Sequence, residues 1–355
     1  MEVQLSEAEK VFIIHGAQEG LRADGRGPLD YRPIIVQTGV LATTNGSARV
    51  QIGSTDLLIG VKAELISVDT TVYRNRLNFF VDCSANATPL LLHFISALYL
   101  DKGEKWNSRN LHEYTVLSGI SELNLGYFRV LKLVFLLNIG RGGEEFADEL
   151  SAALDAAYDN NYVLPDLKKL ILSPMHAWKL FVDIVLLQCD GNVIDAAGLG
   201  VKAALKDTEI SKVIVRPADE GKYTIDLPDD NTVWKLDTSR VPLFVSVNRL
   251  GTAKIVDNSL TEEACTRTSV WIAVAPQFVS DINHNQNNQC AVKRDGSIIT
   301  FMRQCGGGTL EIDSLVLEEM ISIGLKTVHQ LHEALNQRLM NENWLIEKPL
   351  STFLQ

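Results

Sequence analysis

The turn Asp190-Gly191-Asn192 is the first place where this sequence could carry chemistry. A strand-like segment from Trp178 to Cys189 precedes the turn, and a segment of helical composition with small residues, Asp195 to Leu205, follows it. A helix that begins directly after a tight turn directs its free backbone amides outward, where they can bind a phosphate. The turn holds no Arg, Lys, Ser or Thr. It therefore lacks the side chains that would hold such a phosphate firmly.

The acidic stretch Val256–Glu263 is a second candidate. It brings three carboxylates close to one predicted strand end, and carboxylate oxygens are the ligands that Mg²⁺ prefers. A metal site needs its acids on a common face, and the segment that follows is Thr266-Arg267-Thr268-Ser269, without further acids. We therefore favour an exposed surface turn here, with a magnesium site as the alternative.

Other motifs exclude several kinds of site. The seven histidines form no metal-type pair, and His329 and His332, three residues apart, are more typical of a solvated helix face. No phosphate-loop, dinucleotide or nucleophile-elbow motif occurs at a strand-to-helix junction. The five cysteines are scattered and odd in number, which favours a reducing compartment over a disulfide framework or a zinc site. We expect no cofactor and no metal.

Composition narrows the class of protein further. The 355 residues are 46% hydrophobic, enough for one large core or two modest ones, and the net charge is −11. Such an acidic chain is not expected to coat nucleic acid by itself, although a local basic groove remains open. Arg22 and Arg26 lie in the glycine-rich loop Leu21–Pro28, which is either a solvated connection or a contact for an anionic ligand or partner. Neither a secretion signal nor a membrane span is expected.

The pattern of elements predicts two rounds of strands followed by a helix, which implies an internal duplication. A capping box at Ser6 and Glu9 begins a helix that runs to about Glu19. Alternating apolar residues then predict an antiparallel meander and a further strand, at 34–36, 48–52, 57–64 and 78–83. Helical spacing predicts a helix at 144–158. The segment Trp178–Cys189 is apolar at both alternating sets of positions, which predicts a strand covered on both faces.

The second half repeats this pattern. Strands are predicted at 212–215, 233–236, 243–248, 252–256, 270–274 and 297–302. A C-terminal helix from about Ser314 to Met340 follows, with apolar residues at helical spacing. The polar run Gln277–Gln289 is expected to be a flexible loop.

Five segments together resemble the RNase PH family, and more narrowly the core-ring subunits of the eukaryotic exosome. They are Leu21–Arg26, Gly46–Asp56, Phe79–Ala85, Cys189–Ala196 and Val201–Leu205. The resemblance implies an α+β fold of the RNase PH type, with two similar β-sheet/helix halves and a C-terminal helix. Their order and spacing hold from about Leu5 to Cys83 and from Gly140 onward.

The resemblance also bears on activity. Active members of the family degrade RNA from its 3′ end by phosphate attack, with a Gly-Thr-x-Arg loop after the central turn and clustered aspartates on a later strand. Here Asn192-Val193-Ile194 occupies the loop, and Cys265–Ser269 stands where the acids are expected. Without those charges phosphoryl transfer loses its stabilisation, so we expect a non-catalytic subunit. An active phosphate-dependent 3′-to-5′ exoribonuclease and a free-standing acidic binding module remain as alternatives.

The partners implied are other RNase PH-like subunits in a six-membered ring, RNA-binding cap subunits and RNA threaded through the channel. The role implied is 3′-to-5′ RNA processing and degradation, including rRNA maturation and mRNA turnover, in nucleus, nucleolus and cytoplasm. We predict that Arg22, Arg26 and Arg141 contact RNA.

The resemblance divides the chain into parts. The RNase PH-like domain comprises 1–89, 140–276 and 292–345, interrupted by 90–139 and by the polar loop 277–291. The apolar blocks in 90–139 lack periodicity, which favours translated intron or a gene-model artefact. A genuine lineage-specific insertion that docks on a neighbour is the alternative.

Overall fold

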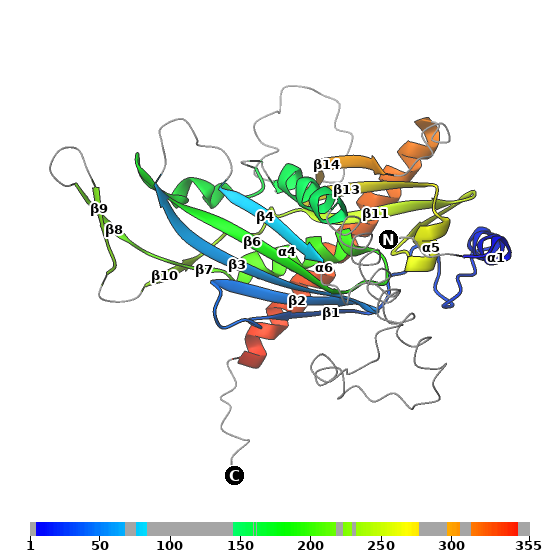
Figure 1. Cartoon of the computed structure of the whole chain (residues 1–355), viewed down its shortest axis with the longest axis horizontal. Coiled ribbons are helices and arrows are strands. Elements are labelled where there is room, and N and C mark those ends of the chain that lie inside the picture. Colours follow the sequence, from blue (N-terminus) through cyan, green and yellow to red (C-terminus); the bar gives the residue numbers. More distant parts are fainter. Residues whose placement is uncertain are drawn as a thin grey trace, which may run out of the picture.

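The computed structural model describes residues 5–67, 76–83, 145–158, 160, 162–217, 223–228, 232–276, 297–305 and 314–346. Within these residues two main sheets enclose a layer of helices, as Figure 1 shows. This arrangement confirms the predicted α+β class and the two sheet-and-helix halves. The predicted interruption at 90–139, the loop 277–291 and Arg141 lie outside the described residues, so the proposed division into parts stays a prediction.

The first sheet has the strand order β1-β2-β3-β6-β4, with β5 paired to β6. Its strands are β1 (Ile34–Thr38), β2 (Gly46–Ile52), β3 (Thr55–Ser67), β4 (Leu77–Cys83), β5 (Ile171–Ser173) and β6 (His176–Gln188). The meander of β1, β2 and β3 is antiparallel, as predicted. The strand β4 does not continue that meander. It pairs in parallel with β6, so β6 lies between β3 and the edge strand.

The strand β6 corrects one prediction. Buried and half-buried residues alternate along it, whereas a strand covered on both faces was expected. Leu180, Val182 and Ile184 point into the core and are fully buried. Phe181 and Val185 lie on the opposite, half-buried face. Apolar residues on both faces of a strand therefore do not require burial of both faces.

The central helix α4 (Val193–Asp207) follows β6 and packs against both main sheets. Every residue from Val193 to Leu205 is buried. Gly200 explains how closely α4 lies on the first sheet, because a Cβ atom there would come within 2.3 Å of Ile59. The small residues predicted to allow close packing do so.

The second sheet has the order β12-β11-β13-β14, and all its pairs are antiparallel. Its strands are β11 (Leu243–Leu250), β12 (Ala253–Val256), β13 (Thr268–Pro276) and β14 (Ser297–Cys305). The C-terminal helix α6 (Ser314–Ile346) packs on β11 and β13. The helix predicted at 144–158 is present over the described residues 145–158, and its apolar face at Leu150 and Leu154 is buried.

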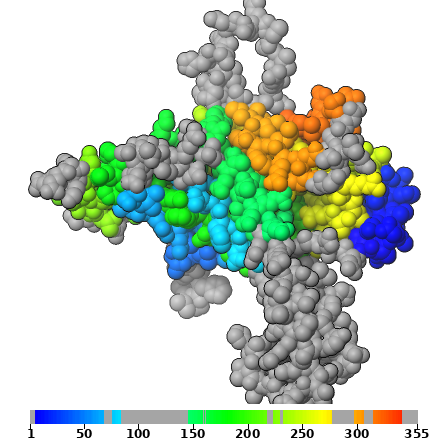
Figure 2. All heavy atoms as spheres, turned by 45° about the horizontal axis from the view of Figure 1, so that its top comes forward, coloured from blue at the N-terminus to red at the C-terminus, as the bar shows by residue number. Residues whose placement is uncertain are grey.

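Smaller elements complete the described chain. They are α1 (Glu7–Gln18), η3 (Pro165–Leu170), α5 (Leu260–Cys265), and the strand pairs β7 (Glu209–Ser211) with β10 (Val233–Lys235) and β8 (Ile214–Pro217) with β9 (Tyr223–Asp226). The capping box predicted for α1 is formed by Ser6 and Glu9. Figure 2 shows α1 at the end of the molecule away from the β8–β9 hairpin. Within the described residues, no helix is both long and apolar enough to span a membrane.

Candidate functional site at the start of the central helix

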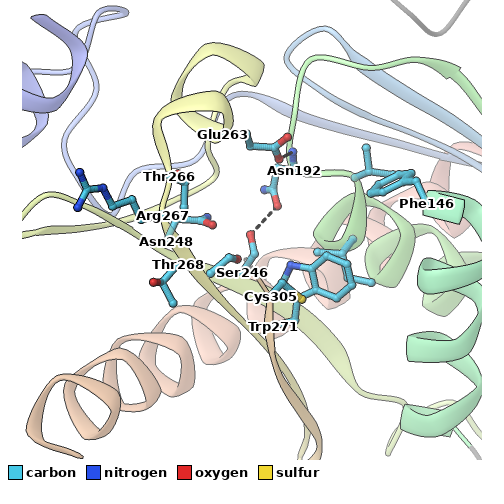
Figure 3. A pocket seen from close by; sticks show the side chains of 13 residues that line it. Phe146, Asn192, Ser246, Asn248, Glu263, Thr266, Arg267, Thr268, Trp271 and Cys305 are labelled. Carbon is cyan, nitrogen blue, oxygen red and sulfur yellow. Dashed lines mark hydrogen bonds between the residues drawn. The ribbon is translucent and has the colours of Figure 1, made fainter. Parts of the chain in front are cut away.

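A pocket of about 210 Å³ lies at the N-terminus of α4. It brings together the two segments that the sequence singled out, 192–194 after the central turn and 266–269 at the start of β13 (Figure 3). The remaining lining comes from β11, α5, β13, β14 and the helix at 145–158, through Phe146, Ser246, Asn248, Glu263, Trp271 and Cys305. The fold thus places these segments where an RNase PH-type site was expected.

Asn192 organises this end of α4. It is the N-cap residue and adopts a left-handed conformation, with φ of 57°, but its side chain does not cap the helix. Its side-chain amide donates to Oδ1 of Asp257 at 2.8 Å, and its side-chain oxygen accepts from Oγ of Ser246 at 2.9 Å (Figure 3). The amide side chain is therefore held in place by two neighbours and is not available as a flexible ligand.

The carboxylate of Glu263 lies directly at the start of α4. Its Oε1 atom accepts a hydrogen bond of 2.6 Å from the backbone N–H of Asn192. The positive end of a helix favours an anion at this position. Here the chain places its own carboxyl group at this position, next to the turn where a bound phosphate was considered. Burial raises the pKa of Glu263 to about 7, and the hydrogen bond from Asn192 acts against that rise.

The charges needed for phosphoryl transfer are sparse in this pocket. Arg267 and Glu263 are its charged lining residues, and the guanidinium of Arg267 points away from Asn192 in Figure 3. Thr266, Thr268 and Ser269 contribute neutral hydroxyl groups instead of carboxylates. Among the residues that the structure describes, no group of three or more His, Cys, Asp or Glu side chains is placed to hold a metal.

Asp257 lies behind the pocket at the centre of a buried ionic network. Its side chain is completely buried, and its carboxylate accepts from Nε and Nη2 of Arg32 at 3.0 and 2.8 Å and from Nη1 of Arg26 at 2.7 Å. Burial opposes ionisation of this carboxyl, but the hydrogen bonds and positive charge of Arg32 hold its pKa below the ordinary value. Asp257 therefore joins two arginines of the N-terminal loop to the end of β12.

Arg32 extends the network to the central turn. Its Nη1 donates to the backbone oxygen of Asp190 at 2.6 Å, and its Nη2 lies 3.3 Å from the backbone oxygen of Gly191. One guanidinium thus connects the turn before α4 with Asp257 on the second half of the chain. This contact fixes the position of the N-terminus of α4 relative to the second sheet.

A second buried carboxyl lies in the first turn of α4. Oδ2 of Asp195 accepts from the hydroxyl of Tyr31 at 2.6 Å, and Oδ1 accepts from the backbone N–H of Ser246 at 2.8 Å. Burial raises the pKa of Asp195 to about 7, and the hydrogen bond from Tyr31 acts against that rise. Asp195 therefore connects the N-terminal loop, α4 and β11, which gives it a structural role.

The acidic stretch differs from both interpretations made from sequence. The surface-turn prediction is wrong for Asp257 and Glu262, which are buried. The magnesium alternative is not supported either, because Arg32 and Arg22 occupy these carboxylates. Glu262 additionally forms a capping box with Ser259 at the start of α5. The acids therefore serve ion pairing and helix capping.

Two of the arginines predicted to contact RNA can be placed. The side chain of Arg22 is completely buried and binds both carboxylate oxygens of Glu262, at 2.9 and 2.5 Å. Its position gives it a structural role and does not support the predicted RNA contact. Arg26 keeps 13% of its side chain exposed while it pairs with Asp24 and Asp257. RNA contact stays a prediction for Arg26.

Sequence reasoning missed Arg32, Tyr31 and Asp195. Tyr31 and Arg32 stand between the glycine-rich loop and β1, in a segment without a recognisable motif. Asp195 was named only within the predicted helix and within the segment Cys189–Ala196, without a role of its own. A polar residue in the first turn of a helix made otherwise of small and apolar residues was the one available signal, because a buried carboxyl needs partners.

Comparison with known proteins agrees with this geometry. Residues 30–97 match the family model described as 3′ exoribonuclease family, domain 1. This segment of the chain is therefore similar to the first domain of that family. The similarity predicted from the five sequence segments is therefore confirmed.

Relatives and solved structures extend the similarity over most of the chain. The Dictyostelium discoideum protein named "Putative exosome complex exonuclease RRP42" is 25% identical over 94% of this chain and 98% of its own length. The exosome complex component Rrp42 of Methanocella arvoryzae is 28% identical over 93% and 96%. An archaeal exosome core chain has the same RNase PH-type fold, with a TM-score of 0.59, 20% identity and coverage of 93% and 97%.

Proposed function

We propose that this chain is a non-catalytic structural subunit of the exosome core ring. The observation that carries the assignment to the exosome is similarity along nearly the whole chain to proteins named as Rrp42 of the exosome complex, from a eukaryote and from archaea. The RNase PH-type fold agrees with it. In this role the chain supports 3′-to-5′ RNA processing and degradation, including rRNA maturation and mRNA turnover, by forming part of the channel through which RNA is threaded.

The composition of the pocket supports the non-catalytic part of the proposal. The attacking phosphate and the RNA phosphodiester that it cleaves both carry negative charge, so catalysis needs cations and a coordinated metal to stabilise the transition state. This pocket instead places the carboxylate of Glu263 at the start of α4. A phosphate at that position would have to displace this carboxyl group from the backbone N–H of Asn192, which disfavours phosphate binding.

The partners that we propose are other RNase PH-like subunits in a six-membered ring and RNA-binding cap subunits. We also propose that RNA passes close to Arg26 and Arg141 on the way through the channel, and that the complex works in nucleus, nucleolus and cytoplasm. The chain has a net charge of −11, so basic surface for RNA must come largely from neighbouring subunits.

Affinity purification of the tagged full chain from its native cells tests the assembly. We expect other RNase PH-like subunits to co-purify in equal molar amounts through a size-exclusion column, as measured by quantitative mass spectrometry. A matched purification with an equally expressed, unrelated acidic protein gives the background. Recovery of the chain as a monomer, or with partners that are not exosome subunits, would argue for a free-standing binding module instead.

A further inference from the structure

A lysine is buried in the helix layer between the two main sheets. Lys202 lies in the middle of α4, only 2% exposed, and its Nζ atom donates to the backbone oxygen of Val241 at 3.3 Å. Among the described residues, no carboxylate forms a hydrogen bond or an ion pair with Lys202. A buried cation without an anionic partner carries a desolvation cost that its surroundings must reduce.

The partner of this lysine is His332 on α6. Nζ of Lys202 lies 2.9 Å from Nδ1 of His332, and Nε2 of His332 lies 3.2 Å from the backbone oxygen of Val274 on β13. These contacts assign the tautomer: Nδ1 accepts from Lys202, and Nε2–H donates to Val274. His332 is 6% exposed, so the sequence-based prediction of a solvated face is wrong for it.

Only one hydrogen can lie between Nζ of Lys202 and Nδ1 of His332, which are 2.9 Å apart. A second proton on His332 would sit on Nδ1, facing the N–H groups of Lys202 at 2.9 Å. Two donors, both positively charged, would then oppose each other inside an apolar layer that includes Met320, Val328 and Leu335 of α6. The contact between α4 and α6 therefore depends on a neutral imidazole.

We infer that Lys202 and His332 form a proton-sensitive latch between α4 and α6, closed while His332 is neutral and released when His332 gains a proton. The other titratable groups that act on the pair are Lys206 on α4 and His329 on α6, and both act against an added positive charge. The segment before β11 and the strand β13 present backbone oxygens to it. Opening of the latch would loosen the C-terminal helix before the sheets separate.

The direction of the pH dependence follows from the environment of each group. Burial, and after it the charge of Lys202, lower the pKa of His332 to about 3. The stability that neutral His332 provides is therefore complete above its ordinary value of 6.5 and is lost as the pH falls toward 3. Burial lowers the pKa of Lys202 to about 7, so its own contribution changes mainly at higher pH. Part of that change falls near pH 7, so the comparison of the wild-type chain with His332→Gln is needed to separate His332 from Lys202.

Hydrogen exchange of α6 between pH 7.5 and pH 5.0 tests the latch, with rates corrected for the intrinsic pH dependence of exchange. When α6 opens, His332 becomes exposed and titrates near 6.5. Proton uptake in the open state then raises the equilibrium constant for opening of α6 about 30-fold between pH 7.5 and pH 5.0. We expect this rise in the wild-type chain and in His329→Gln, the control on the same helix. We expect it to disappear in His332→Gln, whose amide keeps one acceptor and one donor but cannot gain a proton.

A second variant keeps the test possible if His332→Gln does not fold. Lys202→Met combined with His332→Leu replaces the pair by apolar side chains, which buried pairs often tolerate. This double variant should also lose the rise. A wild-type opening constant that does not change between pH 7.5 and 5.0, or a rise of equal size in His332→Gln and the wild-type chain, would overturn the latch.

Discussion

Asp257→Ala is expected to lower the free energy of unfolding by about 3–5 kcal/mol, because it leaves buried arginine charge without a partner. The side chain of Asp257 is completely buried and binds Arg32, Arg26 and Asn192 at once. Its loss would release the guanidinium of Arg32 from the centre of the network and free the N-cap residue of α4. Urea unfolding at neutral pH, followed by circular dichroism, measures the change.

Asp24→Ala is the matched control for Asp257→Ala. Asp24 binds the same arginine, Arg26, at 2.6 Å, but 42% of its side chain is exposed. An exposed ion pair contributes only about 0–1 kcal/mol, so this variant should unfold close to the wild-type urea concentration. Equal losses from the two variants would mean that the buried network does not stabilise the fold in the way described.

Gly191→Ala is expected to be the next most damaging substitution, with a loss of about 2–4 kcal/mol from a strained backbone and a steric clash. Gly191 has a φ of +83°, which favours glycine, and an added Cβ would come within 2.5 Å of the backbone oxygen of Asn258. Backbone cannot move aside as a flexible side chain can. The central turn would have to shift away from the segment that leads into α5.

Gly25→Ala separates the two causes. Gly25 has a nearly identical φ of +82°, but nothing lies within 4 Å of an added Cβ. This variant should lose only the conformational part, about 1–2 kcal/mol. Thermal unfolding of both variants checks the difference, and a Gly191→Ala variant no less stable than Gly25→Ala would contradict the close packing of the turn on Asn258.

Local patterns predicted the elements well. Ser6 and Glu9 begin α1 as expected because a capping box acts between residues three apart. The strands β1, β2 and β3 pair with their neighbours along the chain in the predicted antiparallel sense. The small residues of α4 pointed to close packing on a sheet, and Gly200 provides it. Each of these signals depends on neighbours in the sequence.

The contacts that build the site depend on distant residues. Arg32 and Asp257 are 225 positions apart, and Lys202 and His332 are 130 apart. Spacing along the chain carries no information on such pairs, so an acidic run looked like a surface turn and a histidine looked solvated. The parallel pairing of β4 with β6 was missed for the same reason, since the two strands are far apart in sequence.

The claim that this pocket no longer catalyses is tested most directly by a phosphorolysis assay on the purified full chain. Single-stranded RNA, inorganic phosphate and Mg²⁺ are incubated with the protein, and released nucleoside diphosphates are measured by chromatography. We predict no release above the protein-free control. Release of diphosphates that is lost in Ser246→Ala, a variant confined to the pocket, would contradict the account.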